Sequence, residues 1–140
     1  MQLCSRREHC RKEIFDKIVS RGCSQTQAEE IVNVLVEQNF LDEKRYTMAF
    51  VKDKMRFNKW GRVKIAYMLR AQNIDKNIVI DVFSEIDETD YNEILTGELR
   101  KKYKGLTGSQ FEIKGKLFRF ATGRGFESEI VNEAISKMMK

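Results

Sequence analysis

The sequence predicts an all-α fold, and three features carry that prediction. Apolar residues recur at intervals of three and four along most of the chain, which is the period of a helix that buries one face. The two-residue alternation of a half-buried strand never persists. The 140 residues include no proline, the residue that interrupts helices most strongly. We therefore expect helices joined by short turns.

The helical pattern also repeats along the chain. Gly22, Asn73 and Gly125 occupy the same point of a helix–turn–helix pattern, 51 and then 52 residues apart. An apolar residue and then a polar capping residue follow each of them. A period of about 50 residues with a shared apolar register is typical of stacked supersecondary units. The sequence thus predicts one elongated array of tandem three-helix repeats over residues 1–41, 42–86 and 87–140, the first lacking its leading helix or truncated in it.

The predicted helices begin at residues whose side chains can accept hydrogen bonds from the free amides of a first turn. In chain order these starts are Ser5 with Glu8, Ser24 with Gln27, Asp42, Asp75, the segment 87–90, Ser109 with Glu112, and a last start near Glu127. The helices are expected to end at residues that tolerate a left-handed backbone or in polar loops. These ends are Gly22, Asn39, the corner 58–61, Asn73, Ile86, the loop 104–108 and Gly125, with the last helix reaching Met138.

The segment from Leu41 to Phe57 is predicted to be one long helix with an apolar face and a basic face. The apolar face would hold Tyr46, Ala49, Phe50 and Phe57, widened by Val51 and Met55. The basic face would hold Arg45, Lys52, Arg56 and Lys59. Such a helix has one side for the core and one side for a partner.

Charge is arranged in alternating blocks: residues 44–70 and 100–124 are basic, and residues 75–98 are acidic. Cations on a helix face neutralise phosphates without reading base sequence, so the basic blocks are candidate nucleic-acid contacts. The candidates in the first block are Arg45, Lys52, Arg56, Lys59, Arg62, Lys64 and Arg70. The candidates in the second block are Lys101, Lys102, Lys104, Lys114, Lys116, Arg119 and Arg124. The alternative for any single one of them is a solvated residue that only keeps the protein soluble.

Several aromatic residues have a structural and a binding interpretation. Trp60 is expected to pack the corner between two helices and Tyr67 to lie at a repeat interface, although both could stack on a base. Phenylalanines of the third repeat are expected in its core. These are Phe111, Phe118, Phe120 and Phe126.

The residues offer little that could catalyse a reaction or hold a metal. One histidine and three cysteines without CxxC spacing predict neither a zinc site nor a disulfide framework. No serine–histidine–acid set or phosphate-binding glycine loop is present, so we expect no enzyme and no cofactor. The acidic segment 87–90 is interpreted as a helical first turn. The absence of a long apolar run or a signal-peptide core predicts a cytoplasmic protein that contacts no membrane.

A motif in the first basic block resembles a known family. Leu41-Asp42, Tyr46, Phe50, Lys59-Trp60-Gly61, Ile65, Leu69 and Ile74 resemble the signature of the RecX family, best over residues 40–86. Members of that family are small bacterial proteins, built of tandem three-helix repeats, that regulate the RecA recombinase. The resemblance implies a regulator that binds RecA on single-stranded DNA, inhibits its ATPase, recombinase and strand-exchange activities, and acts in DNA recombination, repair and the SOS response.

The expected protein is therefore a monomer that contacts the RecA filament through Lys52, Arg56, Lys59, Arg62 and Lys64, with the block 100–124 as a second contact. The acidic block would face a basic protein surface or solvent. Sequence-specific reading of DNA is disfavoured, because the helices that would enter a groove are acidic or neutral. Two alternatives stay open: a sequence-neutral nucleic-acid-binding helical protein, and a helical scaffold for another protein partner.

Overall fold

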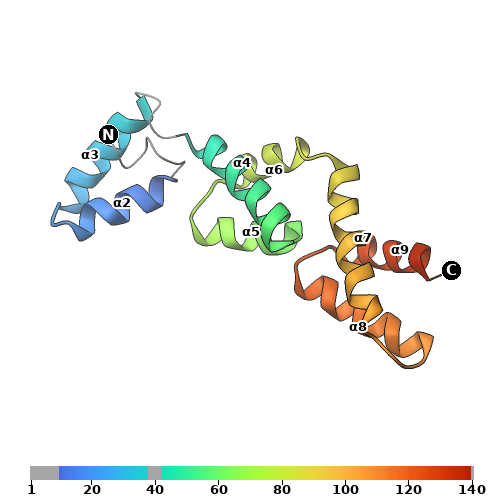
Figure 1. The fold of residues 1–140 in the computed structure, drawn as a ribbon. Helices are drawn as coiled ribbons and strands as arrows, with labels where there is room; N and C mark the ends of the chain where they lie inside the picture. The colour runs from blue at the N-terminus through green and yellow to red at the C-terminus, as the bar shows by residue number, and fades with distance from the viewer. Residues whose placement is uncertain (1–9, 38–41, 140) are drawn as a thin grey trace. The chain divides into compact units, whose positions relative to one another are not determined.

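The computed structural model describes residues 10–37 and 42–139, and all regular structure in these ranges is helical, as the sequence predicts (Figure 1). No strand occurs among the described residues. The helices are α2 (Arg11–Ser20), α3 (Gln25–Glu37), α4 (Glu43–Asp53), the π-helix η1 (Lys54–Asn58), α5 (Arg62–Ala71), α6 (Lys76–Ser84), α7 (Glu88–Lys104), α8 (Gln110–Gly123) and α9 (Ser128–Met138).

The chain divides into two compact units. The first consists of Met1–Phe50 and Met68–Val82, and the second of Val51–Tyr67 and Phe83–Lys140. Helices α4, α5 and α6 therefore contribute residues to both units. The compact units do not follow the sequence repeats 1–41, 42–86 and 87–140, whose boundaries stay a prediction.

The three repeated turns share one backbone geometry. Gly22, Asn73 and Gly125 all have positive φ, at 100°, 59° and 96°. In each turn this residue donates its amide to a carbonyl three residues back, and the next residue donates to a carbonyl five residues back. That pair of bonds is the Schellman motif, which satisfies the last carbonyls of a helix. The sequence spacing thus located three equivalent helix ends.

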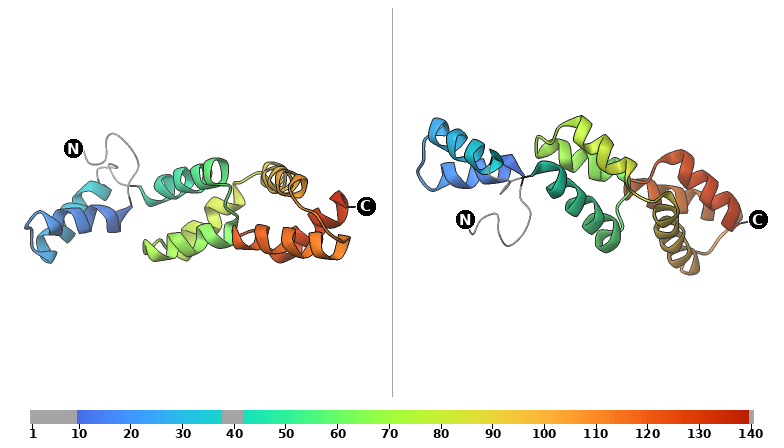
Figure 2. Two further views of the ribbon diagram at one scale, coloured as in Figure 1. Left: turned by 60° about the horizontal axis from the view of Figure 1, so that its bottom comes forward. Right: turned by 90° about the horizontal axis from the view of Figure 1, so that it is seen from above.

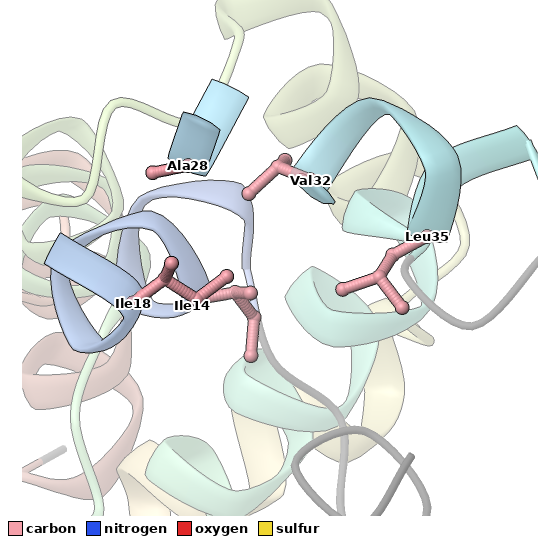
Figure 3. Close-up of a cluster of buried hydrophobic side chains, with 5 residues drawn as sticks. All are labelled: Ile14, Ile18, Ala28, Val32 and Leu35. Atoms are coloured by element: carbon pink, nitrogen blue, oxygen red, sulfur yellow. The ribbon is translucent and has the colours of Figure 1, made fainter. Parts of the chain in front are cut away.

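The core of the first unit lies between α2 and α3, which form a helical hairpin (Figures 1 and 3). Burying each large aliphatic side chain of this cluster contributes about 1.5–3 kcal/mol. The buried residues are Ile14, Ile18, Ala28, Val32 and Leu35. The predicted capping box at the start of α3 is confirmed, since Ser24 Oγ accepts from the Gln27 amide and Gln27 Oε1 accepts from the Ser24 amide, both at 3.2 Å.

The start of α2 differs from the prediction. Cys10 has an extended backbone (φ −88°, ψ 162°), so the helix begins at Arg11 and does not run unbroken from Ser5. Glu13 Oε1 accepts from the Cys10 amide and caps this start. The capping box of Ser5 with Glu8, the helix end at Asn39 and the motif residue Leu41 lie outside the described residues.

The predicted long helix from Leu41 to Phe57 is wrong at its end, where η1 replaces the last α-helical turns. A π-helix closes hydrogen bonds over five residues, so every side chain beyond it is rotated from its α-helical position. Phe57 lies in this segment and is 79% exposed. Ala49 is also exposed, although it lies in α4 before the π-helix. The buried residues of this segment are Tyr46, Thr47, Val51 and Met55. The predicted cap is confirmed, because Asp42 Oδ1 accepts from the Arg45 amide at 3.1 Å.

The second unit is built on α7, α8 and α9, which pack together (Figure 2). Asp87 caps α7 by accepting from the amides of Thr89 and Asp90, and Ser109 caps α8 by accepting from the Glu112 amide. Leu95, Leu99, Leu117, Ala121, Val131 and Ile135 are buried in this unit.

Two aromatic residues that were predicted to be buried, Phe111 and Tyr67, are exposed. Phe126 is buried against the ring of Tyr91, but Phe111 is 87% exposed. Phe111 lies roughly 240° around α8 from the buried Leu117, which points it away from the core. Tyr67, expected at a repeat interface, is 66% exposed on α5.

Candidate binding surface

Two glycines attach the beginning of α5 to the turn between α8 and α9 within the second unit. The Gly61 amide donates to the Arg124 carbonyl at 2.8 Å, and the Val63 amide donates to the Gly125 carbonyl at 2.9 Å. A Cβ added to Gly61 would overlap the backbone of Gly125 and Phe126. A Cβ added to Gly125 would overlap Lys64. Only glycine at both positions allows this approach of two backbones.

Trp60 lies at the corner before α5, and its half-buried ring is a platform for two cations. The ammonium groups of Lys54 and Lys64 lie over the ring, at 5.1 Å and 4.4 Å from its centroid. Such cation–π contacts stabilise by about 0.5–1 kcal/mol at exposed sites. Lys64, one of the predicted partner contacts, is therefore partly held by the protein itself.

Arg62, another predicted contact, is engaged inside the protein by several side chains. Its Nε donates to Glu127 at 2.8 Å and its Nη1 donates to Glu88 at 2.6 Å. Its guanidinium also lies 4.1 Å from the centroid of the Tyr91 ring, and its side chain is only 16% exposed. These contacts tie α5 to α7 and to the start of α9, so we assign Arg62 a structural role.

Tyr91 completes this cluster. Its hydroxyl accepts from the Arg62 amide at 2.9 Å and donates to a Glu127 carboxylate oxygen. Burial, together with the hydrogen bond to Glu127, raises the pKa of Tyr91 well above its ordinary value. The phenol therefore stays neutral and donating across the physiological range.

The remaining predicted contacts of the first block fall in different units. Arg45 and Arg70 are exposed in the first unit, whereas Lys52, Arg56 and Lys59 belong to the second. Lys52 and Arg56 are exposed, and Lys59 is half-buried with a left-handed backbone (φ 58°). The structure brings these last three residues together within the second unit.

Lys52, Arg56 and Lys59 line a groove of the second unit between η1 and α7, which we call the η1–α7 groove. It consists of two adjoining hollows of about 440 and 220 Å³ that share Arg56, Asp90 and Ile94. The remaining lining residues are Lys52, Met55, Lys59, Glu85, Ile86, Asp87, Glu93, Gly97, Glu98 and Lys101. Three of the four residues of the predicted basic stripe therefore line a groove together with acidic residues of α7, for which the sequence predicts contact with a basic protein surface or solvent.

The second basic block lies on α7, α8 and the turn after α8. Glu98, whose side chain is 12% exposed, pairs with Arg124 at 3.4 Å and with Lys101 at 3.7 Å. Lys102 and Arg124 lie over the Phe120 ring, at 5.4 Å and 4.8 Å from its centroid. The exposed residues of this block also include Lys104, Lys114, Lys116 and Arg119.

Neither a metal cluster nor a reactive thiol marks these surfaces. Within residues 10–37 and 42–139, no three side chains of the His, Cys, Asp or Glu types are grouped to hold a metal ion. Burial raises the pKa of the Cys10 thiol to about 11, and its Sγ contacts Gln72 Oε1 at 3.7 Å. A buried thiol of raised pKa is chemically inert near neutral pH. No helix among the described residues is both long and apolar enough to span a bilayer.

Comparison with known families matches the two parts of the chain that hold this surface. The model of the second three-helix domain of RecX matches residues 42–82, and the model of the third three-helix domain matches residues 88–135. The chain belongs to the RecX family. The matched domains also bear out the tandem three-helix architecture that the repeated turns indicate.

Curated relatives of this RecX-family chain carry the name Regulatory protein RecX. The protein of Clostridium perfringens (strain 13 / Type A) is 28% identical over 130 residues, which are 91% of this chain and 60% of that protein. The protein of Chlorobium phaeobacteroides (strain BS1) is 26% identical over 140 residues, covering 100% of this chain and 91% of that protein. The chain thus spans 60% of the length of the clostridial relative.

Solved structures of RecX share the fold. The crystal structure of RecX from Lactobacillus salivarius aligns with a TM-score of 0.89 at 22% identity, covering 99% of this chain and 90% of that chain. A second RecX crystal structure aligns with a TM-score of 0.86 at 19% identity over 97% of this chain. At these identities the likeness establishes the fold alone.

Proposed function

We propose that this chain is a non-enzymatic, monomeric regulator that binds the RecA–single-stranded DNA filament and inhibits the ATPase, recombinase and strand-exchange activities of RecA. Its membership of the RecX family and the regulatory name of its relatives support the proposal.

The observation that carries the proposal is the presence of two differently charged surfaces in the second unit, one of mixed charge and one basic. Lys52, Arg56 and Lys59 line a groove that also contains carboxylates. The exposed lysines of the second block lie on α8 and at the end of α7. A nucleoprotein filament presents both protein and phosphate. The groove of mixed charge suits contact with the protein, and the exposed lysines suit contact with the phosphates.

The test is the ATPase activity of RecA on single-stranded DNA, titrated with this protein beside its own binding to bare DNA at the same salt. We expect inhibition at protein concentrations about tenfold below its dissociation constant for bare DNA, because a filament-directed regulator gains affinity from RecA itself. Inhibition only where bare DNA is saturated would instead identify a sequence-neutral DNA binder. No inhibition at any concentration would leave the interpretation as a scaffold for another partner.

A further inference from the structure

We propose that the η1–α7 groove binds a protein segment that carries both charge signs, rather than nucleic acid. The inference rests on the proposed function, in which that segment belongs to the RecA subunit of the filament. The basic stripe alone is compatible with contact to protein and with contact to phosphate. The inference distinguishes these two roles.

The charges of the groove argue against a phosphate ligand. Its lining includes four cations (Lys52, Arg56, Lys59 and Lys101) and five acids (Glu85, Asp87, Asp90, Glu93 and Glu98). The groove is therefore not positive in sum, although the stripe read from the sequence is. A nucleic-acid strand in it would bring phosphates against carboxylates, and juxtaposed like charges suppress binding. A segment that carries both acidic and basic side chains complements both kinds of charge in the lining.

The uncharged residues of the groove, which we call its floor, offer a place for an uncharged anchor. Met55 is buried, and Ile94 and Gly97 are partly exposed along α7. No atom lies within 4 Å of a Cβ added to Gly97, so packing does not require glycine there. Glycine is also among the least favourable residues inside a helix. Its effect at this position is to leave the floor open, as a pocket for one apolar side chain would need.

The first variant fills that floor. Gly97→Gln places a neutral, helix-favouring side chain in the open space, and it should raise the unfolding temperature slightly. Gly123→Gln is the matched control, because a Cβ at Gly123 also meets no atom within 4 Å and Gly123 does not line the groove. The probe is a fluorescent single-stranded oligonucleotide, either bare or coated with RecA.

We expect Gly97→Gln to weaken binding to the RecA-coated probe about tenfold, the scale of losing one anchoring contact, and to leave binding to the bare probe unchanged. Gly123→Gln should match the wild type on both probes. Equal binding of Gly97→Gln and wild type to the coated probe would overturn the inference. An equal loss on bare and coated probes would also overturn it, since the groove would then hold nucleic acid.

The second variant distinguishes the protein interpretation from the nucleic-acid interpretation, because the two predict opposite changes in the affinity for the filament. Glu93→Lys adds positive charge to the groove, which strengthens filament binding if the groove holds phosphate and weakens it if α7 meets cations of a protein. We expect weaker binding to the coated probe and equal or stronger binding to the bare probe. Glu30→Lys, on an exposed position of α3, controls for the change in net charge.

The two proposals fail in different ways. A wild-type protein that does not distinguish the coated probe from the bare one contradicts the proposed function, and the inference falls with it. A wild type that prefers the coated probe, together with a Glu93→Lys variant that binds it more tightly than Glu30→Lys does, overturns the inference alone.

Discussion

Equivalent positions of the repeat make different demands on the residue that occupies them. Gly22, Asn73 and Gly125 share a left-handed backbone, which glycine and asparagine adopt at little cost. A Cβ at Gly22 meets no atom within 4 Å, whereas a Cβ at Gly125 overlaps Lys64. An asparagine at Gly22 would therefore meet backbone strain alone, whereas one at Gly125 would meet backbone strain and a steric overlap.

Asparagine substitutions at the two glycine turns measure this difference. We expect Gly22→Asn to lower the free energy of unfolding by less than about 1 kcal/mol, since it reproduces the residue found at the second turn. Gly125→Asn should cost about 3 kcal/mol or more, because the α8–α9 turn would have to separate from Gly61 and Lys64. Urea denaturation followed by circular dichroism measures both. Equal losses of unfolding free energy in the two variants would show that the close approach of the two backbones does not stabilise the protein.

At the residue level, the sequence predicts features that depend on neighbouring residues in the chain and does not predict those that depend on contacts between distant segments. The positive φ of Gly125 depends on its own helix end, and the repeated spacing predicts it. The overlap with Lys64 and the burial of Arg62 against Glu88 and Glu127 depend on which distant segments meet. No local pattern contains that information, and so Arg62 resembled its exposed basic neighbours.

At the level of elements, helix types and turns were predictable, and one change of helical period was not. Capping residues such as Ser24, Asp42 and Ser109 act within a few residues of themselves, and their predicted bonds are present. The π-helix η1 adds one residue to a turn without an obvious signal in its sequence. It moves Phe57 from the predicted apolar face to the surface, and it lies where Arg56 lines the groove.

The basic residues in and beside η1 give the next prediction. Reversing Lys52, Arg56 and Lys59 to glutamate should raise the protein concentration needed for half-inhibition of the RecA ATPase about tenfold or more, because complementary charges at the groove would become like charges. Helix content should stay unchanged, since Lys52 and Arg56 are exposed.

The control for this reversal carries the same change in net charge at other places. Arg21, Lys76 and Lys137 are exposed and do not line the groove, so their reversal should change half-inhibition by no more than about twofold. Similar losses in both triple variants would assign the effect to net charge, and the groove would lose its role.

At the scale of the whole molecule, charge blocks in the sequence do not translate directly into charged surfaces. The net charge of +5 and the basic block 44–70 suggest a continuous positive face. Folding instead places part of that block opposite the acids of α7 and uses Arg62 internally. The central claim is consequently a preference for a protein-coated filament over bare nucleic acid.

The most direct test of that claim is a pair of dissociation constants, measured by fluorescence anisotropy on one labelled single-stranded oligonucleotide with and without a RecA coat, at about 0.15 M salt. We predict a dissociation constant for the coated oligonucleotide that is lower by about tenfold or more. Equal constants, or tighter binding to the bare strand, would contradict the account and identify a protein that recognises nucleic acid alone.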